Sequence, residues 1–159
     1  EENKAKPAAA AKKSTPDLKP FVDNENGTVT DPNTGLIWKK TDAWLDTHKF
    51  YTWQAHQEYV DKVNKEKFAG YDDWRLPTLE ELKKLYDPSR PIKSKDNERI
   101  GLPVSFKSGG SYYLWTNNER GLDNAWYFGL GFKEDYFNLK ELGDLDQGVK
   151  MVRARSSKN

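Results

Sequence analysis

The sequence predicts an α+β fold, in which two helices precede a run of antiparallel strands. Apolar residues recur with helical spacing in two segments only, residues 53–67 and 79–86. From Leu102 onward, short segments rich in β-prone residues alternate with glycines. Helices early in the chain and strands late in it are typical of an α+β domain, with helices packed against a sheet.

The chain has 159 residues, which is the size of one domain with a hydrophobic core. Residues 1–20 differ from the rest, because they hold five lysines, three prolines and a run of four alanines. We expect a flexible tether over residues 1–20 and one folded domain over residues 21–159. Because the chain begins at Glu1 without methionine, we also expect that a leader was removed; an artificial extension is the alternative explanation of the tether.

The first expected element of the domain is a β-hairpin. Residues 28–30 alternate like a strand, residues 31–35 supply turn residues, and residues 36–38 continue as a second strand. Glycine tolerates the left-handed conformation that such turns require, so we expect Gly35 to adopt it.

Thr52 can cap the first helix, which we expect over residues 53–67. Trp53, His56, Val60 and Val63 are spaced by 3, 4 and 3 residues and therefore share one face. His56 falls on this apolar stripe, so we interpret it as a hydrogen-bonded core or boundary residue and not as a ligand.

The second helix is expected to begin at Leu79. Pro77 favours an extended conformation at the residue before it, and Thr78 with Glu81 three residues later forms a capping box. The apolar face of this helix comprises Leu79, Leu82, Leu85 and Tyr86. Strands are then expected over residues 112–116, 125–130, 136–139 and 149–155.

Four blocks of this sequence, in this order, resemble one bacterial family, the Lcl C-terminal domain family. They are residues 27–31 with 34–38, residues 73–78, residues 114–116 with 125–126, and residues 151–155. The resemblance implies a C-type-lectin-like fold with two helices, a twisted antiparallel sheet and a long-loop region. It also implies a relationship to formylglycine-generating enzymes, which share the Arg-Leu-Pro-Thr block. The family's closing strand usually carries a cysteine, which this chain lacks.

The chain contains no cysteine, which excludes disulfides, thiolate metal sites and the cysteine- and copper-dependent oxidation of the formylglycine-generating enzymes. With two histidines and no serine elbow or paired-carboxylate motif, we expect no enzymatic activity. No apolar run approaches the roughly 20 residues of a membrane helix, so we expect no membrane span.

The net charge of +1 divides into +2 for residues 1–20 and −1 for the remainder. A nearly neutral domain lacks the field that attracts nucleic acid, so we expect no nucleic-acid partner. Residues 83–99 hold six basic against three acidic residues. This segment either contacts sulfated glycans or phosphate, or is a solvated helix end and loop.

Calcium is the one cofactor that the sequence leaves open. Asp23, Glu25 and Asp31 place carboxylates around a glycine-containing loop, as hard-cation sites do, although the same residues suit a tight turn. A second candidate set comprises Glu141, Asp144 and Asp146 in a glycine-flanked loop.

Nine of the 21 aromatic residues fall between positions 112 and 137. Because strands alternate sides, about half of this group can be core while half points outward. Outward rings beside amides and acids would form a carbohydrate or protein docking face; an aromatic-rich core under polar loops is the alternative. The predicted ligand-binding residues are Trp115, Asn117, Asn118, Glu119, Asp123, Asn124, Trp126 and Tyr127. Trp38 and Trp74 are expected in the core, with Arg75 paired to a carboxylate or backbone oxygens.

These features together predict an exported, non-enzymatic recognition module that binds a glycan or a protein at a cell surface. Its location would be periplasmic, cell-surface or extracellular, and the family resemblance implies an adhesin that contacts glycosaminoglycans. The alternative function is an interaction subunit of a larger cell-envelope or filament assembly, and a homo-oligomer stays open.

Overall fold

The computed structural model describes residues 18–154 and has a mixed α+β architecture, as predicted. The predicted tether lies mostly outside the described residues, as does Arg155 of the last predicted strand. Residues 18–20 of the predicted tether are described. The backbone of Lys19 exchanges two 2.8 Å hydrogen bonds with the side chain of Asn33, which ties this end of the tether to the first hairpin.

The first sheet joins the two ends of the described chain. It contains β1 (Val22–Asp23), β2 (Thr28–Asp31), β3 (Leu36–Lys39) and β10 (Val152–Ala154), in the order β1-β2-β3-β10. All three pairings are antiparallel, with Thr30 opposite Ile37 and Val152 opposite Trp38. The predicted hairpin is thus confirmed, and Gly35 has the expected positive φ of 78°.

The described chain has three α-helices where the sequence predicted two. The additional helix, α2 (Ala43–Thr47), is too short to show an apolar period. The helix predicted over residues 53–67 is the shorter α3 (His56–Lys65). The Thr52 hydroxyl does accept a hydrogen bond from the Ala55 amide, at 3.1 Å, but within a turn that precedes the helix. A 3₁₀ turn, η2 (Phe68–Gly70), follows α3.

Helix α4 (Leu79–Leu85) begins where the capping box predicts. The Thr78 hydroxyl accepts from the Glu81 amide at 3.0 Å, and the Glu81 carboxylate accepts from the Thr78 amide at 2.9 Å. Arg75 donates to both carboxylate oxygens of Glu81 at 2.8 Å, which confirms the predicted pairing of Arg75.

The second large sheet carries the aromatic part of the chain. Its strands are β6 (Tyr113–Arg120), β7 (Asn124–Gly129), β8 (Glu134–Leu139) and β9 (Gln147–Gly148), in the order β8-β7-β6-β9. The pair β6–β9 is parallel and the other two pairs are antiparallel. A register shift interrupts the pairing of β6 with β7 between Trp115 and Glu119. Separately, β4 (Ile92–Lys93) pairs with β5 (Arg99–Ile100).

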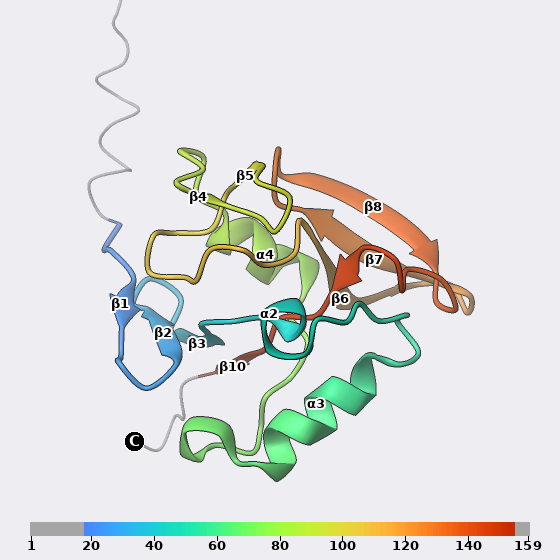
Figure 1. The fold of residues 1–159 in the computed structure, drawn as a ribbon, viewed down its shortest axis with the longest axis horizontal. Coiled ribbons are helices and arrows are strands. Elements are labelled where there is room, and N and C mark those ends of the chain that lie inside the picture. The colour runs from blue at the N-terminus through green and yellow to red at the C-terminus, as the bar shows by residue number, and fades with distance from the viewer. Residues whose placement is uncertain (1–17, 155–159) are drawn as a thin grey trace, which may run out of the picture.

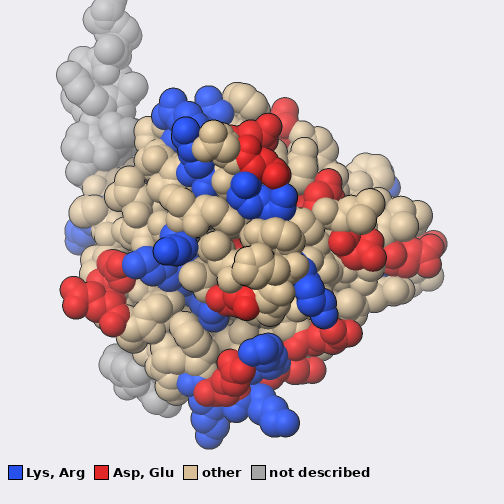
Figure 2. Space-filling view, in the orientation of Figure 1, with Lys and Arg blue, Asp and Glu red and all other residues tan. Residues whose placement is uncertain are grey.

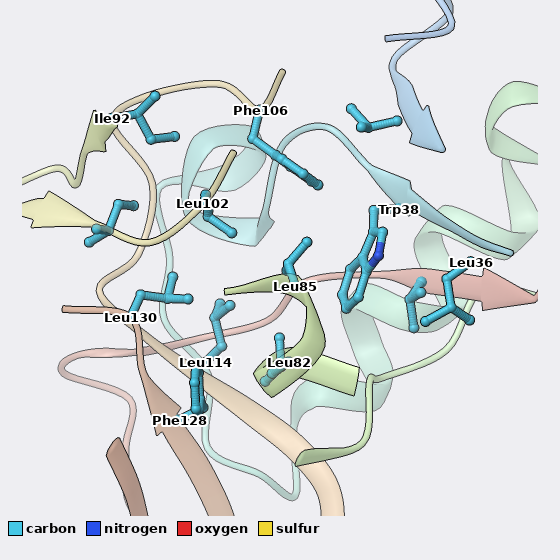
Figure 3. Packing of buried hydrophobic residues seen from close by; sticks show 13 residues of the cluster. Leu36, Trp38, Leu82, Leu85, Ile92, Leu102, Phe106, Leu114, Phe128 and Leu130 are labelled. Atoms are coloured by element: carbon cyan, nitrogen blue, oxygen red, sulfur yellow. The ribbon is translucent and has the colours of Figure 1, made fainter. Parts of the chain in front are cut away.

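Two hydrophobic clusters lie on opposite sides of this sheet, one including residues of α4 and the other residues of α3. Figure 1 shows these two helices, with α4 above and α3 below. On one side, Leu114 and Phe128 pack with Leu82 and Leu85 of α4 and with Trp38, as Figure 3 shows from close by. On the other side, the second cluster contains buried residues of α3 together with Trp74, Trp115, Ala125 and Met151. Trp38 and Trp74 are 0% and 2% exposed, so their predicted core positions are confirmed.

No helix within residues 18–154 has both the length and the apolar composition needed to cross a membrane.

Candidate functional site

One side of the second sheet exposes a contiguous group of aromatic and polar side chains. Trp126 of β7 lies opposite Phe137 of β8, with ring centroids 5.4 Å apart and an interplanar angle of 76°. Asn124 and Leu139 form the next cross-strand pair on the same side. The Arg120 guanidinium lies 3.9 Å from the Phe137 ring centroid. We call these five residues, Arg120, Asn124, Trp126, Phe137 and Leu139, the tryptophan face.

This face is open to solvent because helix α4 covers only part of the same side of the sheet. The helix covers Phe128, which lies on the same side of β7 as Trp126 and is fully buried. Asp135, opposite Phe128, forms a 3.2 Å ion pair with Lys83 of α4 at the edge of the covered area. The sheet continues past α4 to the right in Figure 1. There Phe137 and Leu139 are 46% and 38% exposed.

The predicted amide Asn118 lies next to α4 on the bulged part of β6. Its Oδ1 accepts a hydrogen bond from the backbone amide of Leu79 at 2.7 Å, which leaves the Asn118 Nδ2 group free to donate elsewhere. Asn117 is exposed and held by its backbone, whose amide donates to the Pro77 carbonyl at 2.9 Å.

Three further predicted ligand residues lie in an ion pair, in a turn and in the core. Glu119 pairs with Lys140 at 2.5 Å, and Asp123 lies in the exposed β6–β7 turn. Trp115 is 0% exposed, and its Nε1 donates to the Tyr51 carbonyl at 2.8 Å. The prediction that Trp115 contacts a ligand is therefore wrong, because its ring is sealed in the core between β6 and α3.

Tyr127 lies on the opposite side of the sheet from Trp126, within a cluster of tyrosines that the sequence did not single out. Its ring is stacked on Tyr136 at 5.3 Å and meets Tyr113 edge to face at 5.5 Å. Tyr113 also contacts Tyr112 at 4.8 Å and Tyr136 at 5.8 Å. The alternation of residues along β6, β7 and β8 was the signal that could have grouped Tyr113, Tyr127 and Tyr136.

A cleft of about 230 Å³ opens beside these tyrosines. We call it the tyrosine cleft; its lining residues are Phe50, Lys95, Asp96, Glu98, Tyr112, Tyr113, Leu145 and Asp146. Partial burial raises the pKa of Tyr113, and the nearby carboxylate of Asp146 raises it further. A hydrogen bond to Glu134 raises the pKa of Tyr136 to about 12. Partial desolvation also raises the pKa of Asp146.

Neither predicted calcium set forms a metal site. Asp23 binds Lys40 at 2.7 Å, and this contact lowers its pKa. Asp31 closes the first hairpin, accepting from the Asn33 amide at 2.8 Å and the Thr34 hydroxyl at 2.9 Å. These residues, with Glu25, serve the alternative role of tight turns.

In the second set, Asp146 accepts from the Gln147 side chain at 2.7 Å, while Glu141 and Asp144 are exposed. Across residues 18–154, no three or more His, Cys, Asp or Glu side chains converge as a metal site would require.

The basic segment 83–99 is largely engaged in local contacts. Lys95 pairs with Asp96 at 2.8 Å, Arg99 donates to two backbone carbonyls, and Arg90 lies 4.5 Å from the Phe132 ring centroid. Figure 2 shows basic and acidic side chains intermixed over much of the visible surface. This arrangement favours the interpretation of the segment as a solvated helix end and loop.

A larger groove, of about 690 Å³, lies between the first hairpin and the end of α4. Leu18, the first described residue, forms part of its wall. The chain before Leu18, residues 1–17, lies outside the described residues.

In a comparison with protein families, residues 27–153 match the model described as the Lcl C-terminal domain. No curated protein matches the chain.

Proposed function

The chain belongs to the Lcl C-terminal domain family, and from this premise we propose that it is an exported, non-enzymatic recognition module that binds a glycan at a cell surface. The tryptophan face is the proposed binding surface. The proposal also includes a C-type-lectin-like fold. It is supported by the pairing of β10 with β3, which brings the first and last strands into one sheet, and by the largely irregular segment between β8 and β10.

The aromatic pair of half-buried Trp126 and exposed Phe137 is the observation that carries the proposal. Aromatic rings usually bury their apolar area, and here two of them form a contiguous surface with Leu139. Sugar rings present apolar C–H faces that pack on aromatic rings, and their hydroxyls need directional hydrogen-bonding partners at the rim. Trp126 and Phe137 supply the first kind of contact.

Arg120 and Asn124 supply the second kind of contact. Both lie beside the rings, and the Arg120 guanidinium, stacked on Phe137, keeps N–H groups for hydrogen bonding at its edge. Such a guanidinium also favours carboxylated or sulfated sugars. Asn118 adds the free Nδ2 donor near the same edge of the sheet.

A glycan array tests the proposal. It should include neutral, carboxylated and sulfated glycans and should be probed with and without calcium. The wild-type chain is expected to retain a defined set of glycans, and Trp126→Ala should reduce that signal at least about tenfold, the equivalent of about 1.4 kcal/mol.

Phe132→Ala is the matched control for this experiment. Phe132 is an aromatic side chain of the same sheet region, 64% exposed, in the β7–β8 turn away from Trp126. Its replacement should leave binding unchanged. Absence of any retained glycan at low salt, or equal losses in the two variants, would remove the glycan proposal.

One observation favours the alternative of a subunit in a cell-envelope or filament assembly. Strand β8 is at the edge of its sheet, and it carries the exposed side chains of Phe137 and Leu139. An edge strand can pair with a strand of another chain. Isolation of a stoichiometric partner from the native envelope, insensitive to free sugars and lost in Phe137→Ala, would support assembly in place of glycan binding.

A further inference from the structure

We propose that the tyrosine cleft is a second binding site, separate from the tryptophan face, and that it takes an organic ammonium group. The cleft is on the opposite side of the sheet from Trp126. Ligands of this class are alkylated amines, such as choline, and the primary amine of an amino sugar.

Tyr112, Tyr113 and Phe50 form the aromatic wall of the cleft. Tyr113 contacts Tyr112 on the wall and Tyr127 and Tyr136 behind it, and all three ring pairs meet edge to face. All four tyrosine side chains are half-buried, so the rings hold one another in place while part of each stays accessible. The faces of aromatic rings carry negative electrostatic potential and attract ammonium groups.

The lining of the cleft carries more negative than positive charge. Asp96, Glu98 and Asp146 face one cation, Lys95, and the Lys95 ammonium is already 2.8 Å from Asp96. Within residues 18–154, neither Glu98 nor Asp146 forms an ion pair, so two carboxylates have no cationic partner. The raised pKa of Tyr127, caused by burial first and by Asp146 second, is consistent with a negative field here.

At the rim of the cleft, the side-chain ammonium of Lys95 already lies over aromatic rings. The Lys95 Nζ lies 5.0 Å from the Trp44 ring centroid and 5.6 Å from that of Phe50, a wall residue of the cleft. Trp44 and Phe50 are themselves stacked, with centroids 4.6 Å apart. The local combination of aromatic rings and a carboxylate therefore suits a cation within this chain.

The size and the polar groups of the cleft limit the ligand to a small head group. A volume of about 230 Å³ is that of several waters, at roughly 30 Å³ each. Among the described residues, the hydroxyls of the two lining tyrosines, Tyr112 and Tyr113, have no hydrogen-bonding partner, so they are free to bind polar atoms of a ligand next to its ammonium group.

The test is an NMR titration of the full chain at constant ionic strength with choline and, separately, with glucosamine. We expect saturable shifts of the Tyr113 and Asp146 signals with at least one of them. Saturation by choline alone identifies an alkylated ammonium, and saturation by glucosamine alone identifies a primary amine. The neutral choline isostere 3,3-dimethylbutan-1-ol should bind at least about tenfold more weakly, because it lacks the charge.

Variants separate this site from the tryptophan face. Asp146→Asn changes an exposed side chain and should weaken binding about tenfold, whereas Tyr113→Phe keeps the ring and should retain it. Trp126→Ala should leave ammonium binding intact even where it abolishes glycan binding. The inference is overturned if neither ammonium compound saturates, if the neutral isostere binds equally well, or if Asp146→Asn has no effect.

Discussion

At the scale of single residues, Lys150 is the least expected feature of the core. Its side chain is fully buried, with Nζ donating to the Lys39 carbonyl at 3.0 Å and lying 4.5 Å from the Phe106 ring centroid. Nothing in the sequence distinguishes Lys150 from an exposed lysine, because its burial follows from the long-range contacts of the segment before β10. Burial lowers the pKa of Lys150 to about 8.

This pKa predicts a pH-dependent stability. Between about pH 8 and 10.5 the folded chain releases the Lys150 proton while the unfolded chain keeps it, so the unfolded state binds more protons. The free energy of unfolding therefore gains a contribution that increases with pH in this window and is absent below it. We expect Lys150→Met to lack this contribution.

Urea unfolding of both proteins at intervals from pH 7 to 10.5 measures the effect. The wild-type free energy of unfolding should increase relative to that of Lys150→Met by roughly 1–3 kcal/mol across the window. The comparison cancels the titration of the tyrosines, which both proteins share. Parallel pH profiles would show that the lysine keeps an ordinary pKa.

At the scale of elements, local signals predicted some boundaries and missed others. The capping box located the start of α4 because all its interactions lie within four residues of sequence. Helix α2 gave no such signal, since five residues are too few for a periodic pattern. The start of α3 was placed three residues early, because Thr52 caps a turn in place of the helix.

The hydrogen bonds of the capping box also predict how much stability is lost when one of them is removed. Thr78→Ala deletes the hydroxyl that accepts from the Glu81 amide at 3.0 Å, so that amide loses its partner. We expect a loss of about 1 kcal/mol in the free energy of unfolding, measured by urea denaturation. Ser108→Ala, at an exposed serine, is the control and should change stability by less than about 0.5 kcal/mol. Equal values for the two variants would contradict the role of Thr78 as a cap.

At the scale of the whole molecule, the second sheet carries both buried and partly exposed aromatic residues. The sequence located its aromatic residues, but it could not assign them to the core, the tryptophan face or the tyrosine cleft. That assignment depends on the register shift between Trp115 and Glu119 and on the limited length of sheet that α4 covers. Both are long-range properties. As a result, the buried Trp115 was wrongly placed among the ligand residues, whereas Asn124 and Trp126 lie together on a partly exposed side of the sheet.

The two tryptophans of this sheet should therefore respond differently to replacement. Trp115→Ala removes a fully buried ring and its hydrogen bond to Tyr51, so we expect a loss of about 3–5 kcal/mol in the free energy of unfolding. Trp126→Ala alters a partly exposed ring and should cost roughly 1 kcal/mol or less. Chemical denaturation measures both values, and comparable losses would contradict the division between core and surface.

Recognition by the tryptophan face is tested most directly by chemical-shift mapping of the full, isotope-labelled chain with the best glycan from the array. The account predicts that the largest shifts fall on the tryptophan face, defined above by its five residues, and on Asn118 beside it. The account would be contradicted if the tryptophan face were unperturbed and the largest shifts fell elsewhere. Such other places are the groove at Phe21 and Val104, and the basic segment 83–99.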